Sequence, residues 1–186
     1  LLTPRLAAPV IEPANEIRAT VIGAGAYSLS ISGSSGFMDE NLSFPIRNVP
    51  VIRVDVDRSR LSVEHVISQI NVSYQRFDLS EGEDIAALYF KDTFRASYPE
   101  LELLARSVEA ALPNSIARKL PIILVFEKDI ACGAGNVIRR ETSLKTNLLA
   151  LDELILKEGD WIDIGEPLVA GQVFPVTVKS LVFHRN

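Results

Sequence analysis

The sequence predicts an α/β domain, with a mostly parallel sheet flanked by helices and an antiparallel extension at the C-terminal end. Between residues 51 and 156, apolar runs of strand length alternate with segments whose apolar residues recur at helical spacing. This alternation is typical of strand–helix–strand crossovers, and so of parallel strands with helices on both faces. From Gly159 to Phe183, short alternating runs are separated by glycine-rich corners, which favours antiparallel strands.

Composition excludes several classes of protein. The chain has 186 residues, of which 47% are hydrophobic and 23% charged, enough to bury a core and too apolar for a disordered segment. A net charge of −5 with scattered basic residues argues against a nucleic-acid surface. No apolar run has the length of a membrane span, and the first residues lack a signal-peptide pattern. We therefore expect a soluble, cytoplasmic protein with no nucleic-acid or membrane partner.

The first residues predict a linker. Residues 1–13 contain Pro4, Pro9 and Pro13 and begin without an initiator Met, as expected for a segment cut from a longer chain. Residues 14–186 are then predicted to form one C-terminal α/β domain. Within it, Ser28–Ser32 alternates and predicts a strand. For the residues before it, we favour a helix over Glu16–Ala26, and a strand through Thr20–Ile22 is the alternative.

The middle of the chain supplies the crossover units. A strand is predicted at Val51–Val56, and Pro45 and Pro50 place it at an edge or delay its start. Ser62 is expected to cap a helix with apolar residues at helical spacing. Ile85–Phe90 is a continuous apolar run, typical of a strand covered on both faces.

The second half predicts the remaining elements. Ser97–Glu100 matches a capping box, and the helix behind it ends before Pro113. Pro121–Phe126 is the most apolar run and is expected to be a central strand. The last predicted elements are a helix at Ala131–Arg140, a strand at Leu148–Leu156, and strands around Asp160–Ile164 and Val176–Val182.

The best candidate for a binding site is the turn from Asp129 to Asn136. It follows the most apolar strand and opens a helix, and ligands of open parallel sheets bind beyond the carboxyl ends of the strands. Asp129, Gly133 and Gly135 are therefore the predicted ligand-binding residues, with free backbone N–H groups available to an anion. The simpler reading is that Asp129 caps the helix and the glycines form the turn.

No residue pattern predicts catalysis or metal binding. Cys132 is the single cysteine, which excludes a disulfide and a Cys-cluster zinc site, and neither His65 nor His184 has the setting of a catalytic base. Gly23-Ala-Gly25 fails the dinucleotide pattern, because Ser28 stands where a glycine is needed, and the sequence contains no P-loop. Whether the chain is an enzyme therefore stays open.

Three stretches together resemble a known family. They are RATVIGAGAYSLSISGSS with the downstream FPIRNVPV, then PIILVFEKDI, and finally LALDELILKEGDWIDIGEPLVAGQVFPVTVKSLVF. In this order and spacing they resemble the C-terminal part of the EutA family, the ethanolamine ammonia-lyase reactivating factors. The sequence departs from the family pattern at Ala131-Cys132, where Gly-Lys is usual, and at Tyr27, where a histidine is usual.

The resemblance implies an ATP-dependent, chaperone-like factor, similar to the actin/Hsp70 ATPases, that exchanges damaged cobalamin in the lyase for intact adenosylcobalamin. It implies ATP and magnesium as cofactors of the full-length protein and none for this part, whose sequence lacks the phosphate loops. It also implies ethanolamine ammonia-lyase as partner and association with a bacterial microcompartment. Two alternatives stay open: a small-ligand or anion-binding module, and an architectural domain of an ethanolamine-utilisation assembly that forms homo-oligomers.

Overall fold

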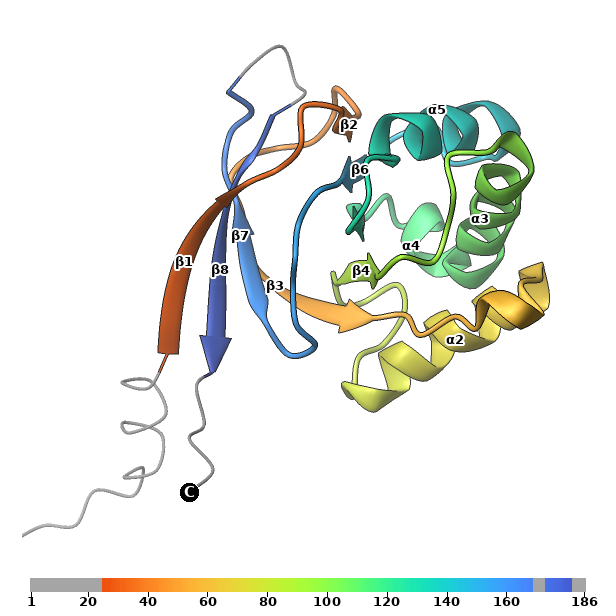
Figure 1. The fold of residues 1–186 in the computed structure, drawn as a ribbon, viewed down its shortest axis with the longest axis horizontal. Helices are drawn as coiled ribbons and strands as arrows, with labels where there is room; N and C mark the ends of the chain where they lie inside the picture. The colour runs from red at the N-terminus through yellow and green to blue at the C-terminus, as the bar shows by residue number, and fades with distance from the viewer. Residues whose placement is uncertain (1–24, 169–172, 182–186) are drawn as a thin grey trace, which may run out of the picture.

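The computed structural model describes residues 25–168 and 173–181 and shows one curled, eight-stranded sheet with helices against it (Figure 1). The strands are β1 Gly25–Ile31, β2 Phe37–Met38, β3 Ile46–Arg53, β4 Ala87–Phe90, β5 Ile122–Phe126, β6 Leu148–Leu151, β7 Trp161–Ile164 and β8 Pro175–Leu181. The helices are η2 Arg58–Arg60, α2 Val63–Arg76, α3 Tyr98–Ala111, α4 Pro113–Ala117 and α5 Ala131–Glu141. The strand order is β1-β8-β7-β3-β4-β5-β6-β2.

The predicted α/β class is confirmed, but the sheet is mixed rather than mostly parallel. β3, β4, β5 and β6 pair in parallel through helical crossovers. The other neighbours, β1 with β8, β8 with β7, β7 with β3 and β6 with β2, are antiparallel. Local periodicity identified the crossover units, whereas β1 pairs with β8 across almost the whole chain, a contact that no local pattern encodes.

The prediction of helices on both faces is wrong. Alternate residues of the parallel strands, such as Ile52, Leu88 and Leu124, pack with α2, α3 and α5 in one core cluster. Their neighbours, such as Val51 and Ile123, pack instead against residues of β7 and β8. Figure 1 shows the helices gathered on one side and β1, β8 and β7 standing on the other. The curl of the sheet therefore covers the face that a second helical layer would otherwise cover.

The C-terminal strands form as predicted. Ile162 lies opposite Val178, and Ile164 opposite Val176, and all four are buried in the second core cluster. The two alternating runs therefore point into one core. Three apolar side chains of β1 are instead exposed to solvent: Tyr27, Leu29 and Ile31 are 68%, 73% and 59% exposed.

Several predicted boundaries change. β3 begins at Ile46 and lies between β7 and β4, so it is not an edge strand. Pro50 stands inside the sheet, next to a register shift between Ile46 and Val49. Proline is tolerated within a sheet at such irregularities. β6 stops at Leu151, short of the expected Leu156, because the backbone turns at Glu153, where φ is 55°.

The two predicted helix caps behave differently. The Ser62 side chain accepts a hydrogen bond from the His65 amide at 3.2 Å, as expected for an N-cap. Ser97 makes no such bond, so the predicted capping box does not form. Glu100 binds the Arg95 amide and the Arg58 guanidinium instead, because a cation competes for its carboxylate.

Some predictions fall on residues outside the described part. The linker at residues 1–13 and most of the segment Glu16–Ala26 belong there, whereas Gly25 and Ala26 are the first residues of β1. Among the described helices, none is long and apolar enough to cross a membrane.

Candidate functional site

Charged side chains follow each of the four parallel strands. Asp55 comes after β3, Lys91 after β4, Asp129 after β5 and Asp152 after β6. The carboxyl ends of parallel strands meet at one edge of a sheet, which is where ligands of such sheets bind. We therefore take this edge, from β3 to β6, as the candidate functional site and call it the carboxyl edge.

An open cavity of about 310 Å³ lies at the β3 and β4 end of the carboxyl edge. Its lining consists of Arg53, Val54, Asp55, Val56, Asp57, Lys91 and Thr93. A volume of this size is at the lower limit for small-molecule sites. The lining carries two basic and two acidic residues, so its chemistry depends on how these charges pair.

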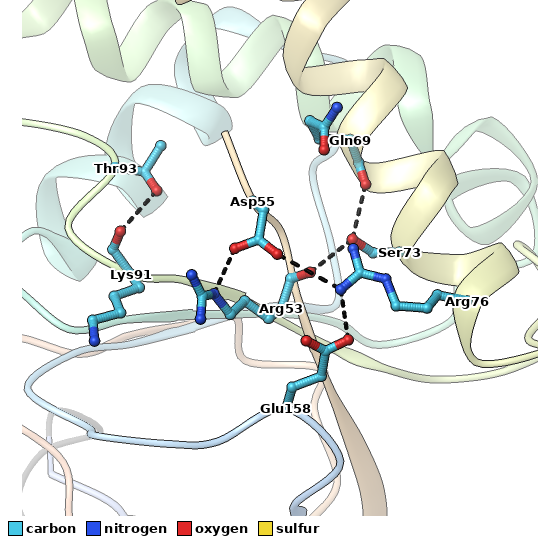
Figure 2. A network of polar contacts seen from close by, with 8 residues as sticks. All are labelled: Arg53, Asp55, Gln69, Ser73, Arg76, Lys91, Thr93 and Glu158. Atoms are coloured by element: carbon cyan, nitrogen blue, oxygen red, sulfur yellow. Dashed lines mark hydrogen bonds and ion pairs between the residues drawn. The ribbon is translucent and has the colours of Figure 1, made fainter. Parts of the chain in front are cut away.

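Asp55 is held between two arginines in this cavity (Figure 2). Arg53 Nε lies 2.6 Å from Asp55 Oδ1, and Arg76 of α2 lies 3.6 Å from Asp55 Oδ2. Arg76 also contacts Glu158 at 2.6 Å, so the network joins β3, α2 and the loop before β7. These side chains are partly exposed, and such pairs contribute little stability each. They connect the segments that form this wall of the cavity.

Lys91 is different from its neighbours. Among the described residues its ammonium group makes no ion pair or hydrogen bond, and it extends away from the Asp55 network in Figure 2. Asp57 turns its carboxylate to Ser59, and the hydrogen bonds from the Ser59 side chain and amide lower the pKa of Asp57. Lys91 is thus the basic group of the cavity that remains available to an anion.

A second ion pair joins Arg58 of η2 to Glu100 near the start of α3, and we call this pair the rim. Arg58 contacts Glu100 through both nitrogens of its fork, at 3.1 and 3.3 Å. Burial acts to raise the pKa of Glu100, but the hydrogen bond from the Arg95 amide and the ion pair with Arg58 outweigh it and lower that pKa overall. Because Arg58 also donates to the Thr93 carbonyl, the rim ties η2 to the loop after β4.

The next strand end is tied in by a further ion pair. Lys128, after β5, pairs with Asp92, after β4, and this hydrogen bond lowers the pKa of Asp92. At the β5 end of the carboxyl edge, the ammonium group of Lys128 is therefore already paired with a carboxylate.

The structure brings Asp129 next to two residues that the sequence prediction missed. Ser35 Oγ lies 2.5 Å from Asp129 Oδ1 and 2.9 Å from Asp152 Oδ2. Asp152 Oδ2 also accepts a hydrogen bond from the Ala131 amide at 2.9 Å, so Asp152, and not Asp129, binds the first turn of α5. The signal for Asp152 was its place directly after a buried strand. Ser35 had no local signal, because it is 117 residues from Asp152.

Gly133 and Gly135 lie inside α5 rather than in a turn. A Cβ on Gly135 would be 2.1 Å from Phe37 Cγ, and one on Gly133 would be 3.1 Å from Leu101 Cδ1. Both glycines therefore face protein side chains closely. Their part in ligand binding, and that of Asp129, stays a prediction.

Within the described residues, the carboxyl edge has no nucleophile that is activated by a histidine. His65 is the one histidine within the described ranges, and its Nε2 accepts a hydrogen bond from the Asp57 amide at 3.2 Å. It therefore activates no serine or cysteine there. Within residues 25–168 and 173–181, no three His, Cys, Asp or Glu side chains converge into a metal cage.

Comparison with known proteins gives consistent matches. Residues 4–184 match the family model described as Ethanolamine utilisation protein EutA. A Salmonella typhimurium protein named ethanolamine ammonia-lyase reactivase EutA is 34% identical over 171 residues, covering 92% of this chain and 35% of that protein. The Escherichia coli K12 protein of the same name is 36% identical over 174 residues, again covering 92% and 35%. No solved structure matches the chain.

Proposed function

Because the chain belongs to the EutA family of ethanolamine utilisation proteins, we propose that it acts as the C-terminal part of an ethanolamine ammonia-lyase reactivase. The observation that carries this proposal is the family match over residues 4–184, together with two relatives of that name at 34% and 36% identity. The chain spans 35% of the length of these relatives, so the activity of the whole protein is part of the proposal.

In this proposal the chain contributes contacts, not chemistry. The described residues contain no nucleophile activated by a histidine, and most charges of the carboxyl edge pair with one another. ATP hydrolysis with magnesium, and the exchange of damaged cobalamin, are proposed for the full-length reactivase acting on the lyase. We further propose that it acts in the cytoplasm, in association with a microcompartment.

Retention of the lyase tests the proposed contact. Immobilised chain, and the full-length reactivase that contains it, are incubated with cobalamin-loaded ethanolamine ammonia-lyase. Two variants then locate the contact: Leu29→Asp on β1, where Leu29 is 73% exposed, and Val72→Asp on α2, where Val72 is 42% exposed. Loss of retention in one variant alone assigns the contact to that face. No retention by either wild-type protein would reject the contact.

Recovery of activity tests the reactivase role itself. Lyase inactivated by a tightly bound cobalamin is mixed with full-length reactivase, ATP, magnesium and adenosylcobalamin. We expect activity to return, and to stay absent when the reactivase lacks the segment that corresponds to this chain. Full recovery with the truncated reactivase would show that this part is dispensable for reactivation.

A second candidate function is anion binding in the cavity. The observation that favours it is the ammonium group of Lys91, which has no partner among the described residues, beside about 310 Å³ of open volume. Calorimetry with adenine nucleotides and cobalamins tests it, with Lys91→Ala against Lys119→Ala, whose side chain lies outside the cavity lining. Binding that Lys91→Ala alone weakens supports the proposal, and no heat with any of these ligands rejects it.

A further inference from the structure

Asp152 is a buried carboxylate with incomplete hydrogen bonding. It is 0% exposed, and its Oδ2 accepts hydrogen bonds from Ser35 Oγ and the Ala131 amide. Its Oδ1 is buried and has no hydrogen-bond partner. Burying an ionised carboxylate without full compensation is costly, because the group loses its hydration. Among the described residues, one buried carboxylate oxygen is therefore left without compensation.

The shared contact of Asp129 and Asp152 with Ser35 shows a second deficit in hydrogen bonding. Both carboxylates approach the single hydroxyl of Ser35, at 2.5 and 2.9 Å. A serine hydroxyl has one proton and two lone pairs, so it donates to only one of the two carboxylates at a time. The other carboxylate then faces a lone pair across a short O···O distance. A cation in contact with these oxygens would remove that repulsion.

No basic side chain among the described residues supplies this charge. Among the ion pairs formed by described residues, none includes Asp129, Asp152 or Glu153, and the nearby Lys128 is already paired with Asp92. The carboxylates of Asp129 and Asp152, which share Ser35, and of Glu153, next in the chain, therefore have no opposing basic side chain among the described residues. Bringing like charges together at a partly buried position is unfavourable unless a counter-ion is bound.

Glu153 brings a further oxygen to the free side of Asp152. A Cβ built on Gly33 would lie 2.5 Å from Asp152 Oδ1 and 2.6 Å from Glu153 Oε2, so both oxygens approach the same side of Gly33. Asp129 and Glu153 are exposed, whereas Asp152 is buried between them. The unpaired Oδ1 of Asp152 is therefore buried next to a region of the surface that carries the exposed carboxylates of Asp129 and Glu153.

We propose that Asp129, Ser35 and Asp152 form a site for a hard divalent cation, Mg²⁺ or Ca²⁺, with Glu153 at its entrance. Carboxylate and hydroxyl oxygens are ligands that these ions prefer. The described residues form no cage of three or more His, Cys, Asp or Glu ligands, so water completes the coordination shell, as is usual where one or two carboxylates hold Mg²⁺. The proposed site needs no nucleotide, and it stands whether or not the proposed function does.

Thermal unfolding and calorimetry with the metal alone test the site. The chain is freed of metal with EDTA, which is then removed, and MgCl₂ or CaCl₂ is added at constant ionic strength without nucleotide. We expect a saturable heat of binding, and a rise in Tm of about 5–10 °C at a concentration 100 times the Kd. Which ion gives the larger response identifies the preferred cation.

Variants separate the site from non-specific binding. Asp152→Asn should lose the response to metal and, in metal-free buffer, should unfold at a higher temperature than wild type, because the unpaired charge is gone. Asp129→Asn should weaken the response at least tenfold, whereas Asp92→Asn, at the same edge but outside the cluster, should keep it. Absence of any heat or Tm change in wild type, or a response in Asp129→Asn and Asp152→Asn equal to that of wild type, would overturn the proposal.

Discussion

Gly135 of α5 lies against the ring of Phe37 in β2, so closely that a Cβ on the glycine would be 2.1 Å from Phe37 Cγ and 2.4 Å from its Cδ1. This close contact packs the short strand β2 against α5, at the end of the sheet where β2 pairs with β6. A glycine here is required by packing, because any side chain would occupy the volume of the ring. The contact also explains why Gly135 is tolerated inside a helix.

Substitution of Gly135 by alanine should destabilise the protein. Overpacking a core contact typically costs about 1–3 kcal/mol, while replacing glycine by alanine in a helix gains about 1 kcal/mol. We expect a net loss of up to about 2 kcal/mol in the free energy of unfolding, measured by urea denaturation. In Gly133→Ala, the new Cβ would lie 3.1 Å from Leu101 Cδ1, the end of a side chain that can shift by a few tenths of an ångström, so we expect no loss or a small gain.

A double-mutant cycle with Phe37→Ala isolates the contact. If the Phe37 ring causes the penalty, adding Gly135→Ala to a Phe37→Ala background should cost less than in wild type, by at least about 1 kcal/mol. Additive losses would show that the destabilisation of Gly135→Ala has a different origin.

The sequence predicted those parts of the fold that depend on local patterns. The Ser62 cap, the buried strand at Pro121–Phe126 and the helix from Ala131 all form as expected, because spacing and capping are encoded within a few residues. The curl of the sheet could not be predicted, since it depends on β1 pairing with β8 from the other end of the chain.

The candidate site was predicted in part for the same reason. The rule for parallel sheets placed Asp129 at the carboxyl edge correctly. It did not reveal Ser35, which arrives from the loop between β1 and β2, or the burial of Asp152, which depends on neighbours distant in sequence. The capping box at Ser97 failed because Arg58, brought in by the fold, binds Glu100. Tertiary contacts therefore determined which polar residues meet.

The lowered pKa of Glu100 predicts a loss of stability in acid. Its carboxylate is stabilised in the folded state, so its contribution is present above the ordinary glutamate pKa of about 4.3 and is lost as the pH falls through the lower folded value. Glu100→Gln should therefore be less stable than wild type by about 1–2 kcal/mol at pH 7. The difference should shrink at pH 3, as measured by urea unfolding at both pH values.

A matched variant controls for the general effect of removing a negative charge. Glu40→Gln makes the same change at an exposed residue that forms no hydrogen bond or ion pair among those of the described residues. Its effect should stay within about 0.5 kcal/mol at either pH. A difference between Glu100→Gln and wild type that is the same at pH 3 and pH 7 would contradict the role of the ionised carboxylate.

The buried carboxylate of Asp39 makes Arg139 important for stability. Asp39 is 2% exposed, its Oδ2 accepts a hydrogen bond from the Leu148 amide at 2.8 Å, and its Oδ1 pairs with Arg139. Arg139→Gln leaves this charge without its partner and should cost about 1–3 kcal/mol, measured by denaturant unfolding. In an Asp39→Asn background the same change should cost much less, and an equal cost in both backgrounds would rule out the ion pair as the cause.

Substitutions on the two sides of the curled sheet should change the free energy of unfolding by very different amounts. Ile162 of β7 is 0% exposed and lies opposite Val178, so Ile162→Ala should cost about 2–5 kcal/mol through lost burial and a cavity. Leu29 of β1 is 73% exposed, so Leu29→Thr should change the free energy of unfolding by no more than about 0.5 kcal/mol. Urea denaturation with unchanged m values measures both, and a loss above about 1 kcal/mol for Leu29→Thr would mean that this side chain is covered in the folded chain.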